Sequence, residues 1–264
     1  MRLILAVDFV LAFLAALLLT FLVRRLATIW GFVDEPGGRK KHAISTPQGG
    51  GVAIMLSCSA VIIGASGLVF LWNARPDLVH LPPSLLPAVR RAFRTLPLLL
   101  YVLGGGIAVS LLGLWDDLRP FRPVSKLLGQ TIIISMVVLT SGMRISIFIH
   151  ADWVQAALTI VWIVLLTNSF NLLDNMDGLS ATTAFICGGA LLVLALQTQQ
   201  LFIAGLVLAL IGATLGFLFY NLPPATIFMG DSGSMFLGYT LATATGLTTF
   251  MTGERLNPLF PAFV

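Results

Sequence analysis

Long apolar runs separated by short polar segments dominate the chain, and the pattern repeats about eight times. Runs of this length are typical of helices that cross a bilayer. Because backbone N–H and C=O groups cannot stay unpaired in lipid, we expect each run to be helical. The predicted spans are Leu3–Val23, Val52–Trp72, Leu96–Trp115, Leu127–Ser141, Val154–Thr167, Leu179–Leu196, Leu201–Tyr220 and Met235–Met251. The pattern therefore predicts an all-α, polytopic transmembrane helical bundle that forms a single domain over residues 1–264.

The composition agrees with a membrane protein. The 264 residues are 58% hydrophobic and only 10% charged, whereas about 25% of residues are charged in soluble domains. The formal net charge of +4 is typical of loops at a membrane surface and does not indicate nucleic-acid binding. Cys58 and Cys187 both lie inside apolar runs, with no CxxC motif or Cys/His cluster nearby. We therefore expect neither a disulfide nor a zinc site.

Four polar residues follow the fifth apolar run at a spacing of three. The segment N-S-F-N-L-L-D-N-M-D-G-L contains Asn168, Asn171, Asp174 and Asp177. If the helix continues, these side chains form a polar stripe whose oxygen atoms suit a hard cation and a polar ligand. The alternative is a helix end followed by a turn, since Asn, Asp and Gly are ordinary turn residues. A functional site is favoured because ionisable residues near the membrane interior are costly to keep there.

The loop between the first two predicted spans is basic. Its segment D-E-P-G-G-R-K-K-H holds Arg39, Lys40 and His42. Such a cluster either anchors one side of the membrane by the positive-inside rule or captures a phosphate or an anionic lipid. The two interpretations are compatible, and both stay open at this point.

Two more polar segments stand at the ends of apolar runs. After the third run, W-D-D-L-R-P-F-R-P-V-S-K-L-L-G-Q contains Asp116, Asp117 and Lys126. Before the eighth run, N-L-P-P-A-T-I-F-M-G-D-S-G-S contains Phe228 and Asp231. A charged surface turn is the structural alternative for the first segment, and a helix N-cap is the alternative for the second. The functional interpretation of the second is a metal-binding carboxylate beside an aromatic stacking surface.

The four polar segments occupy the first, third, fifth and seventh loops. If all eight runs cross the membrane, these loops lie on the same side, and one shared site is plausible. Lys and Arg divide almost evenly between the two sides, so the positive-inside rule gives no clear orientation. A transporter or ion channel that uses the Asp and Asn clusters as a translocation site is the competing class.

Together, the four motifs resemble those of the polyprenyl-phosphate N-acetylhexosamine-1-phosphate transferases, membrane enzymes that start lipid-linked glycan assembly. The first-loop motif looks more like the GlcNAc-1-phosphate branch than the phospho-MurNAc-pentapeptide branch. The resemblance implies transfer of GlcNAc-1-phosphate, or a related N-acetylhexosamine-1-phosphate, from a UDP-sugar to undecaprenyl phosphate with release of UMP. It also implies a role in cell-envelope polysaccharide synthesis at the inner (plasma) membrane, with the active site facing the cytoplasm. Whether the chain forms a homodimer stays open.

The resemblance also implies roles for individual residues. Asn171 and Asp231 would hold Mg²⁺ or Mn²⁺, and Lys126 would neutralise phosphate oxygens. Asp116 and Asp117 are the candidate catalytic carboxylates, with one of them acting as a base on the lipid phosphate or as a nucleophile. The candidate substrate-binding residues are Arg39, Lys40, His42, Asp174, Asp177 and Phe228. Of these, Asp177 and Phe228 would hold the uracil.

The family also carries a cytoplasmic loop with His and Arg after its ninth span, followed by further helices. No segment of this chain matches that loop, and His42, His80 and His150 do not form its motif. We therefore expect either a domain that is incomplete at its C-terminal end or a divergent member of the family.

Overall fold

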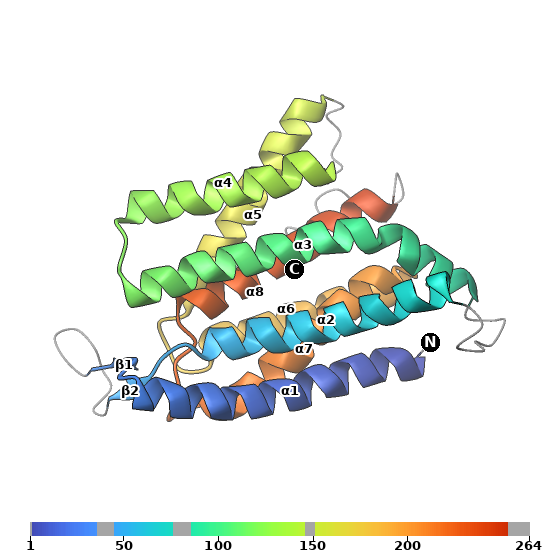
Figure 1. Cartoon of the computed structure of the whole chain (residues 1–264). Coiled ribbons are helices and arrows are strands. Elements are labelled where there is room, and N and C mark those ends of the chain that lie inside the picture. The colour runs from blue at the N-terminus through green and yellow to red at the C-terminus, as the bar shows by residue number, and fades with distance from the viewer. Residues whose placement is uncertain (1, 36–44, 76–85, 146–150, 253–264) are drawn as a thin grey trace.

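Eight helices lie at the places of the eight predicted spans in the computed structural model, which describes residues 2–35, 45–75, 86–145 and 151–252 (Figure 1). A pair of very short antiparallel strands, which the apolar pattern did not predict, precedes the second helix. The helices are α1 (Arg2–Ile29), α2 (Gly50–Ala74), α3 (Leu86–Leu118), α4 (Pro123–Ser141), α5 (Asp152–Leu173), α6 (Leu179–Gln197), α7 (Leu201–Asn221) and α8 (Asp231–Thr252). The strands are β1 (Val33–Asp34) and β2 (Thr46–Pro47), in the register Val33 to Pro47 and Asp34 to Thr46.

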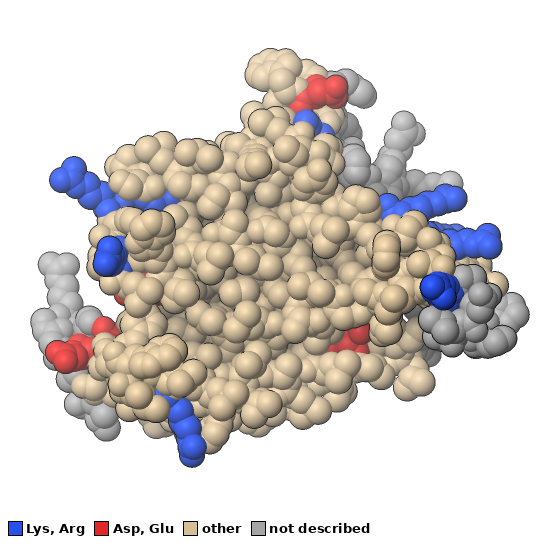
Figure 2. Space-filling view, viewed as in Figure 1, with Lys and Arg blue, Asp and Glu red and all other residues tan. Residues whose placement is uncertain are grey.

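Seven of these helices, α1 to α7, are long and apolar enough to cross a bilayer. On the face drawn in Figure 2, most charged side chains lie towards the left and right ends of the molecule, and the surface between them is largely uncharged apart from one acidic patch at lower right and a charged group at the top. Such a largely uncharged surface is what the hydrocarbon core of a membrane requires. The prediction of an all-α, multi-pass membrane protein is confirmed.

The eighth predicted span, α8, differs in character from the other seven. It contains Ser, Thr and Gly throughout, and over residues 232–248 its side chains are buried. It packs against α2, α3, α5, α6 and α7, so it faces other helices and needs no apolar surface towards lipid. Small side chains on such a helix allow close approach, and three of its threonine hydroxyls donate to carbonyl oxygens one turn earlier, as Thr243 does to Tyr239.

Helix α3 starts at Leu86 instead of the expected Leu96. Its 33 residues correspond to about 50 Å, which exceeds the about 30 Å of a hydrocarbon core. Arg90, Arg91 and Arg94 lie on the additional turns. Their position at one end of a long helix explains how three arginines are accommodated beside an apolar span.

Helix α5 ends at Leu173, in the middle of the predicted polar stripe. Asn168 and Asn171 lie on the helix, whereas Asp174 is its C-cap residue and Asp177 lies in the turn before α6. The stripe is therefore not continuous, and the expectation of four neighbouring side chains on one helix is wrong for its second half. The Asn and Asp residues end the helix there because their side chains compete for backbone hydrogen bonds.

The first and seventh helices pack backbone to backbone. Gly212 and Gly216 of α7 face Ala12 and Ala16 of α1, and a Cβ atom on Gly216 would lie 2.5 Å from the Phe13 carbonyl oxygen. Both helices thus show the small-xxx-small spacing that allows membrane helices to approach closely. This contact holds the N-terminal helix against the middle of the bundle.

A second close approach joins the start of α2 to the start of α8. Gly51 lies against Gly233, and a Cβ atom on Gly51 would overlap the Gly233 backbone. The Gly51 N–H also donates to the Met229 carbonyl oxygen over 2.9 Å. Only glycine fits between the two helix ends, so this contact fixes where α8 begins.

We expect Gly51→Ala to lower the free energy of unfolding by about 1–3 kcal/mol, the usual cost of overpacking. Gly64→Ala is the matched control, because Gly64 lies on the same helix with no atom near its missing Cβ. That substitution should be neutral or stabilising by up to about 1 kcal/mol, since alanine is the better helix former. Thermal unfolding of the purified protein in detergent measures both. Equal melting temperatures for the two variants would contradict the close contact.

Candidate active site

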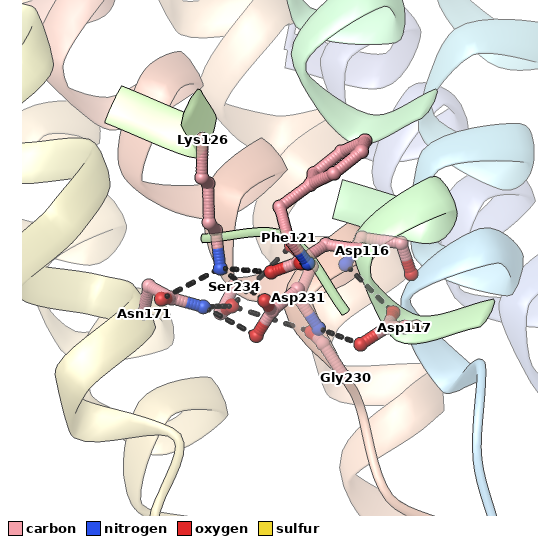
Figure 3. Close-up of polar contacts among 9 residues, drawn as sticks. Asp116, Asp117, Phe121, Lys126, Asn171, Gly230, Asp231 and Ser234 are labelled. Atoms are coloured by element: carbon pink, nitrogen blue, oxygen red, sulfur yellow. Dashed lines mark hydrogen bonds and ion pairs between the residues drawn. The ribbon is translucent and has the colours of Figure 1, made fainter. Parts of the chain in front are cut away.

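Polar side chains from four helices meet at the end of the bundle where β1 and β2 lie (Figures 1 and 3). They come from the end of α3, the start of α4, the end of α5 and the start of α8. These helix ends border the third, fifth and seventh connections between helices, and the strands β1 and β2 lie in the first connection. The described parts of the four loops therefore lie at one end of the bundle, as the alternation of spans predicted.

Lys126 stands at the centre of this cluster (Figure 3). Its Nζ atom lies 2.9 Å from Asp116 Oδ2 and 3.2 Å from Asn171 Oδ1, and it forms an ion pair with Asp231 Oδ2. The lysine and Asp116 side chains are each only 14% exposed, and the Asp231 side chain is 29% exposed. An ammonium group thus joins oxygen atoms from α3, α5 and α8 in a half-buried setting.

Asn171 completes the contacts of Asp231. Its Nδ2 atom donates to Asp231 Oδ1 over 2.7 Å and to Ser234 Oγ over 3.0 Å. The amide oxygen of Asn171 is left to face Lys126. Ser234 was not predicted as a site residue, although its place three residues after Asp231 on α8 could have indicated it.

The two adjacent carboxylates of α3 have different partners. Asp116 accepts from the Phe121 backbone N–H over 2.5 Å and pairs with Lys126. Asp117 turns to α8, where Oδ1 accepts from the Asp231 N–H over 2.9 Å and Oδ2 accepts from the Ser232 N–H over 3.2 Å. Asp117 therefore caps the N-terminus of α8 from another helix, which satisfies two of its unpaired N–H groups.

Two glycines make this cap possible. Gly230 has φ +75°, in the left-handed region, and a Cβ atom there would lie 2.7 Å from Asp117 Oδ2. A Cβ atom on Gly113 of α3 would lie 2.5 Å from the Asp231 carbonyl oxygen. The start of α8 is thus pressed directly against the last turns of α3.

Asp174 belongs to the same acidic group. Burial, together with the negative charges of Asp231 and Asp117, raises the pKa of Asp174 to about 7, although a hydrogen bond from the Gly230 N–H opposes this rise. The carboxyl group therefore titrates near neutral pH. Four carboxyl groups with a single lysine form an acidic site that favours cations.

Asp177 points to a different partner. Its Oδ2 atom accepts from the Ala225 N–H over 2.9 Å. Buried Asn221 makes a second connection nearby, since its Oδ1 accepts from the Gly178 N–H and its Nδ2 donates to the Ile227 carbonyl oxygen, each over 3.0 Å. Together they tie the turn between α5 and α6 to the segment before α8. Asn221 was not predicted, although an Asn that ends an apolar run directly before Leu-Pro-Pro is a visible signal.

Phe228 lies on the segment that these two residues hold. Its backbone N–H donates to the Pro47 carbonyl oxygen over 2.8 Å, and its carbonyl oxygen accepts from the Gly50 N–H over 2.9 Å. The segment before α8 therefore runs along the end of the first loop. The predicted phosphate-binding residues of that loop, Arg39, Lys40 and His42, lie outside the described residues.

The structure thus brings six predicted site residues into one cluster and leaves two on adjoining loops. The cluster consists of Asp116, Asp117, Lys126, Asn171, Asp174 and Asp231. Asp177 and Phe228 lie on the adjoining loops. Over the part of the chain that the structure describes, no three His, Cys, Asp or Glu side chains surround a common metal position. The oxygen-rich, half-buried cluster can instead contact a polyanion through Lys126 and a hard cation through its oxygens.

Comparison with known proteins gives the family. The model of glycosyl transferase family 4 matches residues 99–248. A probable undecaprenyl-phosphate N-acetylglucosaminyl 1-phosphate transferase from Bacillus subtilis is 32% identical over 98% of this chain and 67% of its own length. A phospho-N-acetylmuramoyl-pentapeptide-transferase from Limosilactobacillus fermentum is 38% identical over 79% of this chain and 62% of its own.

A third relative, the decaprenyl-phosphate N-acetylglucosaminephosphotransferase of Mycobacterium tuberculosis, is 33% identical over 84% of this chain. The match covers 55% of that relative, so this chain spans little more than half to two thirds of the three relatives' lengths. The matched region of the family model includes α4 to α7 entirely and the site residues on α3, α5 and α8. The resemblance of the motifs is confirmed, and the chain belongs to glycosyl transferase family 4, together with the polyprenyl-phosphate sugar-1-phosphate transferases.

Proposed function

We propose that this protein transfers GlcNAc-1-phosphate, or a related N-acetylhexosamine-1-phosphate, from a UDP-sugar to undecaprenyl phosphate and releases UMP. The observation that carries the proposal is the Lys126 cluster, in which Asp116, Asn171 and Asp231 converge at one end of a membrane bundle of this family. Relatives named for undecaprenyl-phosphate and decaprenyl-phosphate substrates support the lipid acceptor. The product would start polysaccharide synthesis at the cytoplasmic face of the plasma membrane.

The transfer needs charge neutralisation more than it needs a base. An oxygen of the lipid phosphate forms a bond to the sugar-bearing phosphorus, and the P–O bond to UMP breaks with its electron pair leaving on UMP. The second pKa of a phosphate monoester is near 6, so the lipid phosphate is largely dianionic at pH 7 and attacks without losing a proton. We therefore favour direct attack, in which Asp116 orients Lys126 and Lys126 neutralises phosphate oxygens.

The donor atoms at the site suit Mg²⁺. Asp231 offers a carboxylate and Asn171 an amide oxygen, and the Lys126 ammonium already stands between them as a cation. Mg²⁺ is commonly held by one or two protein carboxylates together with substrate phosphates, without a complete protein cage. Asp231 and Asn171 would hold Mg²⁺ or Mn²⁺, which would offset the charge of the diphosphate when bound.

The nucleotide would lie beside the segment before α8. The ring of Phe228 would provide the stacking surface for uracil. Its backbone is hydrogen-bonded to Pro47 and Gly50, which holds this segment in place. Asp177 fixes the same segment through Ala225, three residues before Phe228, and so shapes the uracil site from its edge. Arg39, Lys40 and His42 remain candidates for phosphate capture. Asp174 remains a candidate substrate contact from the acidic group.

Release of UMP tests this function. Purified protein with undecaprenyl phosphate and Mg²⁺ should release UMP from UDP-GlcNAc or another UDP-N-acetylhexosamine in a panel, and omission of the lipid should stop it. Absence of UMP release with every UDP-sugar would contradict the proposal. Solute uptake by proteoliposomes without UMP release would favour a transporter instead.

A further inference from the structure

The oxygen atoms that would hold a metal ion are already in contact with a lysine. Lys126 Nζ pairs with Asp231 Oδ2 and donates to Asn171 Oδ1 (Figure 3). These two oxygens are the ones that would face a metal ion held between Asp231 and Asn171. The other Asp231 oxygen, Oδ1, accepts from the amide nitrogen of Asn171. Among the residues that the structure describes, Lys126 is the only cation paired with Asp116 or Asp231.

We infer that Lys126 and a divalent cation compete for Asp231 and Asn171, so that Lys126 makes metal binding depend on the nucleotide diphosphate. The inference rests on the proposed function for the identity of the diphosphate. An ammonium and a divalent ion on the same two oxygens repel each other by their like charges in a half-buried site, so each weakens the binding of the other. Asp231 and Asn171 therefore bind a metal ion more tightly once Lys126 has turned away from them.

The geometry gives Lys126 a pivot for this movement. Its third partner, Asp116, is held in place by the Phe121 N–H and is not one of the two proposed metal ligands, although its carboxyl group also contacts that of Asp231. Lys126 lies in the first turn of α4, on a long side chain that can reorient while its ion pair with Asp116 persists. The phosphates of the UDP-sugar provide the new partner for the ammonium. Without the nucleotide the lysine weakens metal binding, and with the nucleotide both cations have anionic partners.

The test measures Mn²⁺ binding to the purified protein, with the electron paramagnetic resonance signal of free Mn²⁺ as the readout. Lys126→Gln removes the charge at similar length, and we expect it to lower the Kd for Mn²⁺ without nucleotide at least about tenfold. Addition of UDP should tighten Mn²⁺ binding to the original protein more than to this variant. Lys126→Arg keeps the charge and should keep the weak binding.

Arg122→Gln is the matched control. Arg122 is an exposed cation at the N-cap of α4, and its side chain contacts none of the site oxygens. The Kd of the Arg122→Gln variant for Mn²⁺ should equal that of the original protein.

The competition is overturned if Lys126→Gln binds Mn²⁺ no more tightly than the original protein. The comparison of Mn²⁺ affinities without nucleotide can fail or succeed separately from the proposed function. Tighter Mn²⁺ binding by Lys126→Gln, with no UMP release by the original protein, would support the competition and contradict the transferase. UMP release by the original protein, with the same Mn²⁺ affinity in Lys126→Gln, would support the transferase and contradict the competition.

Discussion

Replacing Asp231 with alanine is expected to abolish UMP release, with a loss of at least about 100-fold in turnover. The side chain is the common partner of Lys126 and Asn171, and it is one of the two proposed metal ligands. The fold should survive, because Asp231 contributes to the α8 cap through its backbone N–H, which alanine retains. Turnover with Mg²⁺ and thermal unfolding of the same sample measure the two effects separately.

Asp152→Ala is the control for this substitution. Asp152 is an exposed carboxylate in the first turn of α5, on the helix whose other end carries Asn171. Its removal should leave turnover near normal. Near-normal turnover in Asp231→Ala as well would show that the cluster around Lys126 is not the active site.

Asp117→Asn is expected to loosen the start of α8 and to lower the free energy of unfolding by about 1.5–3 kcal/mol, the value of a hydrogen bond to a charged group. The amide that replaces the carboxylate can accept from only one of the two N–H groups of Asp231 and Ser232, and its NH₂ group then faces the other donor. Hydrogen exchange of these two backbone amides should accelerate, and turnover should fall because Asp231 loses its fixed position.

Asp116→Asn separates positioning from chemistry. It changes the adjacent carboxylate but leaves both hydrogen bonds to α8 intact, so exchange at Asp231 and Ser232 should stay slow. If Asp117 acts by position, the residual activity of Asp117→Asn keeps the shape of the original pH profile. A pH profile that loses one limb, with unchanged hydrogen exchange, would instead show that Asp117 transfers a proton.

The helices could be predicted because each span carries its own apolar signal. The start of α3 could not be predicted, because the apolar signal of a span ends where charged residues begin. Arg90 and Arg94 lie on helical turns that extend beyond the hydrocarbon core. The pair β1 and β2 escaped prediction because two-residue strands have no periodicity. Fold class thus follows from local pattern, while element ends depend on contacts between segments far apart.

The site shows the same division. That Asp116, Lys126, Asn171 and Asp231 would meet followed from the alternation of spans and from the motifs. That Asp117 caps α8 did not, because the direction of a side chain at a helix end depends on how neighbouring helices are rotated. The roles predicted for individual residues follow from the resemblance to a family, and they stay predictions until the variants are measured.

The central position of α8 has a consequence for the synthesis of the protein in the cell. Chains are made from the N-terminus, and their helices enter the membrane in that order. A nascent chain that has inserted only α1 to α7 has Asp117 without the N–H groups of α8 and Lys126 without Asp231. Such a chain holds no assembled site, and the space for α8 lies open between α3 and α5. The Lys126 cluster is therefore completed only when α8 has entered the membrane between α3 and α5.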